Sequence, residues 1–284
     1  MIKADLHIHT TASDGLFDPS EVVDWANKKN IKIIAITDHD TTDGIKRAMK
    51  RAKLYDIIVI PGIEFSCNYN GEEMHILGYY INYESDIINE ITNKLKESRL
   101  VRGEKILDKL INMGLKITLE EVKSLAGKGV IGRPHIARAL INRGYVSSIE
   151  EAFSKYIGRN QPAYVERLKL SIEECIELIH KVGGVAILAH PGLIEDDKII
   201  YEIMKYKIDG IEVVHSKHSQ DVIKKLSSLA DSLNLIKTGG SDCHGVLINN
   251  NPLLGDYFIG MSQFKLLKNK ASYYKKRGEQ NEHI

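Results

Sequence analysis

The sequence has few cysteines and no pattern that would pair them. Its three cysteines, Cys67, Cys175 and Cys243, lie far apart among 284 residues, and none belongs to a Cys-x-x-Cys motif. An odd number of scattered thiols argues against the disulfide framework of a small secreted domain. We therefore expect three reduced thiols that behave as small buried side chains.

Long apolar segments and a one-sided charge are also absent. No run of eighteen or more apolar residues occurs, and the chain begins with a strand pattern instead of the apolar core of a signal peptide. The sequence therefore predicts a cytoplasmic protein with no membrane partner. Because 39 lysines and arginines nearly balance 38 aspartates and glutamates, binding to duplex DNA is not expected either. An anionic substrate must then be attracted by a local site.

Alternating strand and helix patterns indicate an α/β fold, and 43% hydrophobic residues suffice for a substantial core. Residues 31–37 form a nearly continuous apolar run rich in β-branched residues, as expected of a strand buried on both faces of a parallel sheet. Asp18 and Pro19 start a helix before it. Further strands are predicted at 1–10, 57–64, 184–190, 208–214 and from 235, and further helices at 42–53, 171–181, 220–233 and 262–274, before a polar tail expected to fray from 275.

Residues 64–79 read as a β-hairpin that turns at Asn70-Gly71, a type I′ signal. A two-residue loop there pairs Tyr69 with Glu72. Counting back along both strands, Ser66 then faces His75. Glu64 and His75 become diagonal neighbours on one face, close enough to bind a common ion. An exposed Glu and His on an ordinary strand are the alternative interpretation.

A helical pattern occupies residues 84–166. Helical periodicity runs over 87–113, and capping residues mark further helix starts near Thr118, Gly132 and Ser148. We interpret 84–166 as a helical insertion that covers the active site. Residues 1–83 and 167–284 would then be the two parts of one α/β domain.

Histidines and acids recur near the ends of successive predicted strands. His7 and His9 lie two residues apart on the first strand and therefore face the same side. Such a pair alone could be ordinary polar residues, but side chains beyond the ends of parallel strands converge in a barrel. Five histidines do not share this placement: His135, His180, His215, His218 and His283. The candidate metal ligands are His7, His9, Asp14, His39, Glu64, His75, His190, Asp242 and His244.

Nine candidate ligands exceed the three or four that one ion with open positions takes from a protein, so two or three ions are expected. Imidazoles and carboxylates without thiolates suit manganese, iron or zinc, with magnesium as another candidate. Three divalent ions would outweigh the three carboxylates, and the positive excess would hold a phosphate. Two neighbouring ions can also activate a shared water, so a metal-bridging hydroxide is the expected nucleophile for phosphoester hydrolysis.

These motifs resemble those of the polymerase-and-histidinol-phosphatase (PHP) superfamily. The similarity includes Asp5-Leu-His-Ile-His-Thr, Thr37-Asp-His-Asp and Gly240-Ser-Asp-Cys-His, and it spans nearly the whole chain. Pro162-Ala-Tyr-Val is also part of the match. The chain resembles one branch in particular, and this resemblance includes Gly132-Arg-Pro-His-Ile-Ala. That branch hydrolyses 5′-mononucleotides or 3′,5′-bisphosphonucleotides, and some members trim RNA from the 5′ end.

The resemblance implies a distorted (β/α)₇ barrel with a helical insertion and a centre of three divalent ions, manganese being the expected metal. By position, the first ion would be held by His7, His9, Glu64 and Asp242. The second would be held by Asp14, His39 and His244, and the third by Glu64, His75 and His190. Glu64 would bridge two of the ions.

The insertion also supplies candidates for substrate binding. Arg133 and His135 open a predicted helix, where a cation and backbone N–H groups could hold a second phosphate or a ribose. An ordinary Arg-Pro helix start would look the same. Asn160, in the loop that ends the insertion, could reach the base or sugar. Asp40, next to His39, is a candidate proton shuttle to the leaving group or a cap of the following helix.

The sequence therefore predicts a metal-dependent phosphohydrolase that removes phosphate from nucleotides. AMP, 3′,5′-bisphosphonucleotides and short RNA 5′ ends are the candidate substrates. A histidinol-phosphate-type phosphatase is one alternative, because it would use the same ligands on another phosphorylated small molecule. A non-catalytic nucleotide-binding domain that keeps metals for stability is an alternative of another class.

Overall fold

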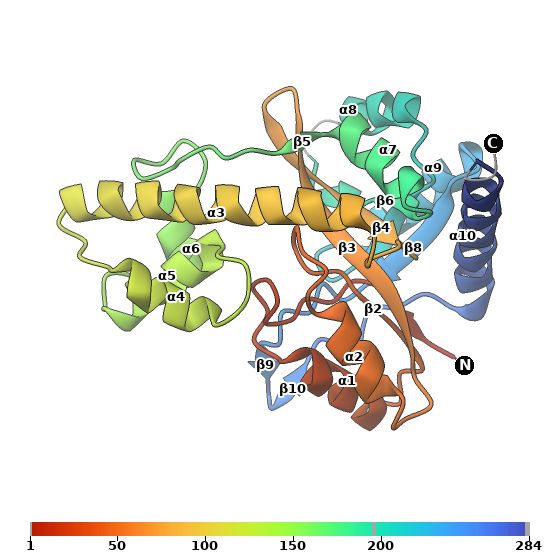
Figure 1. Cartoon of the computed structure of the whole chain (residues 1–284), viewed down its shortest axis with the longest axis horizontal. Coiled ribbons are helices and arrows are strands. Elements are labelled where there is room, and N and C mark those ends of the chain that lie inside the picture. Colours follow the sequence, from red (N-terminus) through yellow and green to blue (C-terminus); the bar gives the residue numbers. More distant parts are fainter. Residues whose placement is uncertain (1, 195–196, 282–284) are drawn as a thin grey trace.

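Seven strands follow one another around a sheet that nearly closes into a barrel (Figure 1). The computed structural model describes residues 2–194 and 197–281. A further short strand, β5 (Leu170–Ser171), pairs with β3 outside this series. In spatial order, the seven strands are β1 (Ala4–Asp5), β2 (Ile33–Ile36), β3 (Ile58–Tyr69), β4 (Glu72–Tyr79), β6 (Val185–Leu188), β7 (Gly210–His215) and β8 (Ile236–Gly240).

The first and last strands of the series approach each other just beyond β1. The backbone N–H of Leu6 donates to the carbonyl of Gly239 over 3.2 Å, and Ile8 forms a parallel bridge with Cys243. Neighbouring strands of the series are parallel, except that β4 is antiparallel to both β3 and β6. The predicted distorted barrel is therefore confirmed, and the β3–β4 hairpin is the main distortion.

Helices cover the outside of this sheet. Figure 1 shows α1 and α2 on one side, α7, α8 and α9 on the opposite side, and α10 alongside β8. α1 begins with the predicted cap, because Asp18 accepts a hydrogen bond of 2.9 Å from the N–H of Ser20. Within residues 2–194 and 197–281, every helix is too short or too polar to cross a lipid bilayer. The outer helices are α1 (Pro19–Lys28), α2 (Ile45–Ala52), α7 (Ile172–Lys181), α8 (Asp197–Ile203), α9 (Gln220–Ser232) and α10 (Met261–Asn281).

The predicted helical region forms a layer beside the barrel. Its longest helix, α3 (Asp86–Asn112), extends away from the sheet, and α4 to α6 pack along its far half (Figure 1). The layer has its own apolar core, which includes Ile106, Leu110, Val122 and Leu140. The division into a barrel domain and an insertion at residues 84 and 166 stays a prediction. The remaining helices of the layer are α4 (Leu119–Ala126), α5 (Arg133–Asn142), α6 (Ile149–Ala152) and a π-helical turn, Phe153–Ile157.

The β3–β4 hairpin has the predicted register. Tyr69 pairs with Glu72 across the two-residue turn, and Ser66 pairs with His75. Asn70 and Gly71 both adopt positive φ, as a type I′ turn requires. Because register fixes the face of every side chain, Glu64 and His75 lie on the same face of the hairpin.

Two predicted elements end elsewhere than expected. The first strand was predicted over residues 1–10, but β1 contains only Ala4–Asp5, and the following residues make irregular hydrogen bonds to β8 and its extension. The last helix was predicted to end near residue 274, but α10 continues to Asn281. The polar residues after 274 include lysine, arginine, glutamate and glutamine, which are good helix formers, so their polarity was not evidence that the helix ends.

A small antiparallel pair, β9 (Leu247–Ile248) and β10 (Asn251–Pro252), follows β8.

A buried carboxylate joins the elements at the amino-terminal end of β7. Asp209 is only 7% exposed. It accepts hydrogen bonds from the N–H of Ala186 over 2.9 Å and from the hydroxyl of Tyr274 over 2.7 Å. His180 Nε2 lies 2.7 Å and Lys270 Nζ 3.0 Å from the same carboxylate. Asp209 therefore ties α7 and α10 to the sheet.

We predict that Asp209→Ala lowers the free energy of unfolding by about 2–4 kcal/mol, because it leaves several buried donors without an acceptor. Urea unfolding followed by circular dichroism measures this change. Asp221→Ala is the matched control, because the Asp221 side chain is 96% exposed and its loss should change stability by less than about 0.5 kcal/mol. Equal stability of the two variants would contradict the role assigned to Asp209.

Candidate metal centre

The nine predicted ligands converge at one end of the barrel. His7 and His9 follow β1, and His39 follows β2. Glu64 and His75 project from the hairpin, and His190 follows β6. Asp14 lies in the turn after the first segment, and Asp242 and His244 follow β8. All nine side chains are buried or half-buried. The structure thus brings together residues that are up to 237 positions apart, counted from His7 to His244.

Glu64 lies in the middle of this cluster. Its Oε2 atom lies between 3.1 and 3.3 Å from ring nitrogens of His7, His9 and His39. Its Oε1 atom lies 2.9 Å from His75 Nδ1 and 3.2 Å from His190 Nε2. The two carboxylate oxygens therefore face two different sets of imidazoles, as a carboxylate that bridges two ions would.

A second group surrounds Asp14. Its Oδ1 atom lies 3.4 Å from His244 Nε2 and 3.8 Å from His9 Nδ1, and its Oδ2 atom lies 4.0 Å from His39 Nε2. One ligand atom of each of these four residues lies within 4.8 Å of the others. His9 and His39 direct one ring nitrogen to Asp14 and the other to Glu64. The two groups are therefore adjacent.

Asp242 forms a third group that includes a histidine excluded by the sequence analysis. Asp242 Oδ1 lies 3.1 Å from His9 Nε2 and 3.5 Å from His7 Nε2. Asp242 Oδ2 lies 3.3 Å from His215 Nε2, and His215 is completely buried. The interpretation that His215 does not share the strand-end placement of the candidate ligands was wrong. His215 is the last residue of β7, so the strand-end rule used for the other ligands could have identified it.

Unpartnered polar atoms test whether this cluster fits metal ions. Eight buried side-chain nitrogen or oxygen atoms of the described residues have no hydrogen-bond partner. Five of the eight belong to the cluster: His7 Nε2, His9 Nδ1 and Nε2, His39 Nδ1 and Glu64 Oε2. Such atoms are rare and costly in folded proteins. Imidazole nitrogens and carboxylate oxygens are ligands of divalent metals, so the donor set fits such ions.

The charge balance of the cluster points to cations as well. Burial opposes the ionisation of Glu64, but the surrounding histidines outweigh it and hold the pKa of Glu64 well below its usual range. Burial also disfavours protonation of His9, yet Asp242 and Glu64 raise the pKa of His9 to about 10. The carboxylates therefore require positive charge beside them. Protons on His7, His9 and His75, whose pKa values are raised, supply it in the protein alone, and metal ions would displace those protons on binding.

Glu212 supports two of the ligands and was missed by the sequence analysis. It is completely buried in β7. One of its oxygens lies 3.0 Å from His7 Nδ1, and the other accepts a hydrogen bond of 2.9 Å from the N–H of His190. The contact orients the His7 ring so that Nε2 faces Glu64 and Asp242. An acid within an otherwise apolar strand was the available signal.

Close packing and buried hydrogen bonds fix the first ligand segment. A Cβ atom on Gly240 would lie 2.3 Å from the backbone nitrogen of His7, so only glycine fits at this point of β8. Asp38 accepts hydrogen bonds from the N–H of Thr10 over 2.7 Å and from the hydroxyl of Ser13 over 2.6 Å. These contacts hold the turn that carries Asp14.

The predicted substrate-binding residues occupy different environments. Arg133, at the start of α5, lies 3.4 Å from Glu73, which in turn lies 3.5 Å from His75. His135 is buried and its Nδ1 accepts a hydrogen bond of 3.0 Å from the N–H of Gly132, so it caps α5. Asn160 is exposed, and no contact with the cluster is found for it among the described residues. Of the three, Arg133 has the most direct connection to the ligands.

Asp40 is buried within a network of arginines. It accepts hydrogen bonds from the N–H of Ser66 over 2.9 Å and from Arg99 Nε over 2.9 Å, and Arg167 Nη2 lies 3.1 Å away. Burial opposes its ionisation, but Arg99 and Arg167 lower the pKa of Asp40 to about 2. The capping alternative was wrong, because α2 begins at Ile45 without a side-chain cap. The proton-shuttle role stays a prediction, and the low pKa weighs against it.

Comparison with protein families identifies the family to which the chain belongs. The family model of the PHP domain matches residues 5–283. The chain belongs to the PHP domain family. The match extends over the barrel, the helical layer and all nine predicted ligands of this PHP protein, and the predicted superfamily is therefore confirmed.

Relatives of the PHP protein are named as enzymes that act on phosphate esters. It is 34% identical over 247 residues to a 5′-3′ exoribonuclease of Haemophilus influenzae, covering 85% of this chain and 90% of that protein. It is 31% identical over 250 residues to a 3′,5′-nucleoside bisphosphate phosphatase of Chromobacterium violaceum, covering 86% and 88%. A structure from Bifidobacterium adolescentis, named as a metal-dependent phosphoesterase, superimposes with a TM-score of 0.85 at 26% identity over 94% and 95% of the two chains.

Family membership and these relatives confirm the predicted enzyme class. The PHP protein is a metal-dependent phosphohydrolase, and the cluster around Glu64 contains several groups of residues that could bind metal ions. The number and identity of the ions and the role of each ligand remain predictions.

We predict that Glu212→Gln weakens Mn²⁺ binding about 10- to 100-fold, because the amide cannot supply the negative charge that supports His7. Calorimetric titration of the metal-free protein with Mn²⁺ measures the affinity independently of catalysis. Glu177→Gln is the matched control, since Glu177 is exposed on α7. Unchanged affinity in Glu212→Gln would show that Glu212 does not position the ligands.

Proposed function

We propose that this PHP protein hydrolyses phosphate esters of nucleotides. The candidate substrates are AMP, 3′,5′-bisphosphonucleotides and the 5′ ends of short RNA. The proposal is supported by the cluster of nine histidines and acids around Glu64, together with relatives at 31–34% identity that are named for RNA or nucleoside bisphosphates.

In this proposal, the nine predicted residues hold three divalent ions, manganese being the most suitable candidate. The groups around Glu64, Asp14 and Asp242 overlap in part with the three ligand sets implied by the resemblance, which supports the proposal. His215 is an additional candidate beside Asp242. Ions bound there would activate water and neutralise the charge of the phosphoryl oxygens. Glu212 orients His7 for this task, and Asp38 fixes the turn that carries Asp14.

Residues 84–166 are proposed to act as an insertion that covers the metal centre. Three contacts support this role. Arg99 of α3 binds Asp40, which follows His39. Arg138 of α5 donates a hydrogen bond of 2.7 Å to the carbonyl of Asp14. Arg133 reaches the metal side of the hairpin through Glu73, so it is well placed to bind a substrate phosphate or ribose. His135 and Asn160 have weaker support, because the ring of His135 already caps α5 and Asn160 has no such contact among the described residues.

The cytoplasmic location expected from the sequence stays part of the proposal. The three cysteines are free and buried, as a reduced protein would have them.

We predict that the protein releases phosphate or nucleotide from at least one of AMP, adenosine 3′,5′-bisphosphate and a short 5′-phosphorylated RNA when Mn²⁺ is present. A chelator should abolish the activity. Asp242→Asn should lower kcat/KM roughly a thousandfold, the effect of losing several kcal/mol of transition-state stabilisation. The exposed substitution Asp221→Asn is its matched control.

The same assay separates the alternatives. Faster turnover of histidinol phosphate than of any nucleotide would favour a histidinol-phosphate-type phosphatase. Tight nucleotide binding and stabilisation by Mn²⁺ without release of any product would favour a non-catalytic domain. No turnover of the three nucleotide substrates would defeat the proposed substrate class.

A further inference from the structure

Two of the nine predicted metal ligands have a left-handed backbone, with φ of 31° at His190 and 52° at Asp242. This conformation is uncommon for any residue other than glycine. Pro191 adds to the strain at His190, because the residue before a proline prefers an extended backbone. Strained conformations persist only where the surrounding structure fixes them. Contacts around His190 and Asp242 must therefore hold both residues in place.

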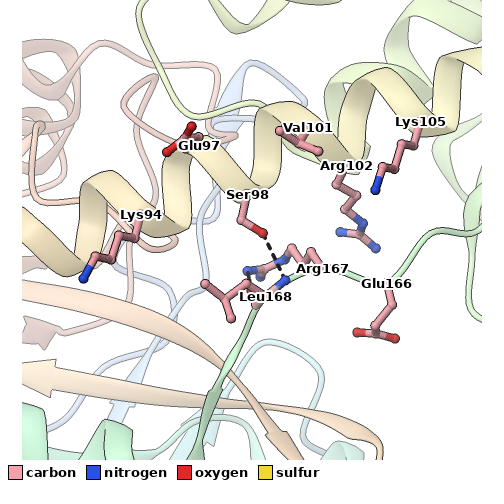
Figure 2. Close-up of a pocket in the computed structure, with 9 residues that line it drawn as sticks. All are labelled: Lys94, Glu97, Ser98, Val101, Arg102, Lys105, Glu166, Arg167 and Leu168. Carbon is pink, nitrogen blue, oxygen red and sulfur yellow. Dashed lines mark hydrogen bonds between the residues drawn. The ribbon is translucent and has the colours of Figure 1, made fainter.

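The helical layer does not supply these contacts. Its helix α3 meets the chain that returns to the barrel at a cleft, where the N–H of Leu168 donates a hydrogen bond of 3.0 Å to the Ser98 hydroxyl (Figure 2). In the part of the chain that the structure describes, residues 84–168 form no hydrogen bond or ion pair with His190 or Asp242. The two ligands are held from the barrel, by β7 and the residues that follow it.

His218, three residues after the end of β7, holds the turn that follows His190. Its Nε2 accepts a hydrogen bond of 3.1 Å from the N–H of Gly192, and its Nδ1 lies 3.0 Å from the carbonyl oxygen of Val213. Because a carbonyl oxygen only accepts hydrogen bonds, Nδ1 must carry the proton and Nε2 is free to accept. The side chain is buried, and both ring nitrogens are used. His218 therefore has one fixed tautomer and no nitrogen left for an ion.

The backbone on the other side of His190 is bound by Glu212. Its carboxylate accepts a hydrogen bond of 2.9 Å from the N–H of His190. Since Pro191 has no N–H group, Glu212 and His218 bind the N–H groups nearest to the ligand on both sides. A Cβ atom on Gly192 would lie 2.7 Å from Cδ2 and 2.8 Å from Nε2 of His218, so the turn and the ring are closely packed. The conformation of His190 is thus fixed from the β7 side.

His215 holds Asp242 in a similar way. It is the last residue of β7 and pairs with Gly240 of β8. Its Nδ1 accepts a hydrogen bond of 3.1 Å from the N–H of Lys217, so the ring proton is on Nε2. This Nε2 lies 3.3 Å from Asp242 Oδ2 and donates to that carboxylate. His215 is therefore a hydrogen-bond donor to a predicted ligand.

The predicted ligands use their rings in the opposite way. His7 Nδ1 lies 3.0 Å from the Glu212 carboxylate, and His244 Nδ1 lies 2.9 Å from the carbonyl oxygen of Asp242. Each Nδ1 can donate a proton to that oxygen and leave Nε2 for an ion, as metal-binding histidines do. His215 would need a proton on Nδ1 to bind an ion through Nε2, but its Nδ1 faces an N–H donor. The hydrogen bonds therefore separate two kinds of histidine.

We propose that His215 and His218 are positioning residues, which hold Asp242 and His190 in the metal centre, and that neither of them binds an ion. His215 is then not an additional ligand. The inference rests on the proposed metal centre. It adds that the geometry of the centre depends on two histidines that carry one proton each and contact the ligands from outside.

Substitution by glutamine separates a positioning residue from a ligand. The glutamine amide can donate or accept a hydrogen bond near the position of Nε2, but Zn²⁺ is bound in proteins by imidazole, thiolate and carboxylate groups. Calorimetric titration of the metal-free protein with Zn²⁺ measures the number of bound ions and their affinity. We predict that His215→Gln and His218→Gln bind as many Zn²⁺ ions as the wild-type protein, with similar affinity. His244→Gln, which removes a predicted ligand, should bind fewer.

Substitution by phenylalanine fills the space but removes both hydrogen bonds. We predict that His215→Phe and His218→Phe weaken Zn²⁺ binding about 10- to 100-fold, the usual cost of losing a residue that orients a ligand. Lys224→Gln is the matched control on α9, because the Lys224 side chain is 79% exposed. Loss of an ion in either glutamine variant, as in His244→Gln, would overturn the inference. Zn²⁺ binding by the phenylalanine variants equal to that of Lys224→Gln would overturn it as well.

The tautomers provide a test that needs no bound ion. Nitrogen NMR of the histidine rings in a chelator should show the proton on Nδ1 of His218 and on Nε2 of His215. The glutamine variants assign the two signals, because each lacks one of them. The opposite tautomer at either residue would overturn the inference. Since this measurement is made without metal, it distinguishes a failure of the inference from a failure of the proposed metal centre.

Discussion

The structure depends on the contact between one buried carboxylate and the imidazoles around it. Glu64 is 1% exposed and lies against five histidines from four other chain segments. An ionised group at this depth is stable only if positive charge surrounds it. The barrel satisfies this requirement by bringing histidines from the ends of separate strands around Glu64. Because the buried carboxylate needs positive charge beside it, the same arrangement favours the binding of cations. Fold and chemistry are therefore linked through Glu64.

Local pattern was sufficient to predict most of the fold and the nine clustered side chains. The Asn70-Gly71 turn determined the register that places Glu64 beside His75, and the apolar run before His39 identified a strand buried on both faces. Glu212 and His215 were missed because their importance comes from contacts with His7 and Asp242, which are distant in sequence. The sequence held a signal for each residue, the end of a strand for His215 and an acid among apolar residues for Glu212. The contacts that give these two residues their importance are visible only in the folded chain.

The role of Asp40 was also assigned from the sequence without knowledge of its long-range contacts. From the sequence, Asp40 was a candidate proton shuttle or helix cap, but in the fold Arg99 from α3 and Arg167 from the returning chain converge on it. This arrangement connects the helical layer to the candidate site, because Asp40, which follows the predicted ligand His39, binds Arg99 of α3.

Gly240 shows that the geometry of the site also constrains residues that take no part in the chemistry. Its single hydrogen lets the backbone of His7 approach to a distance at which a methyl group would collide. Even alanine, the smallest residue that could replace Gly240, would therefore clash with His7. A residue without a side chain thereby determines how closely the segment that carries His7 can approach β8.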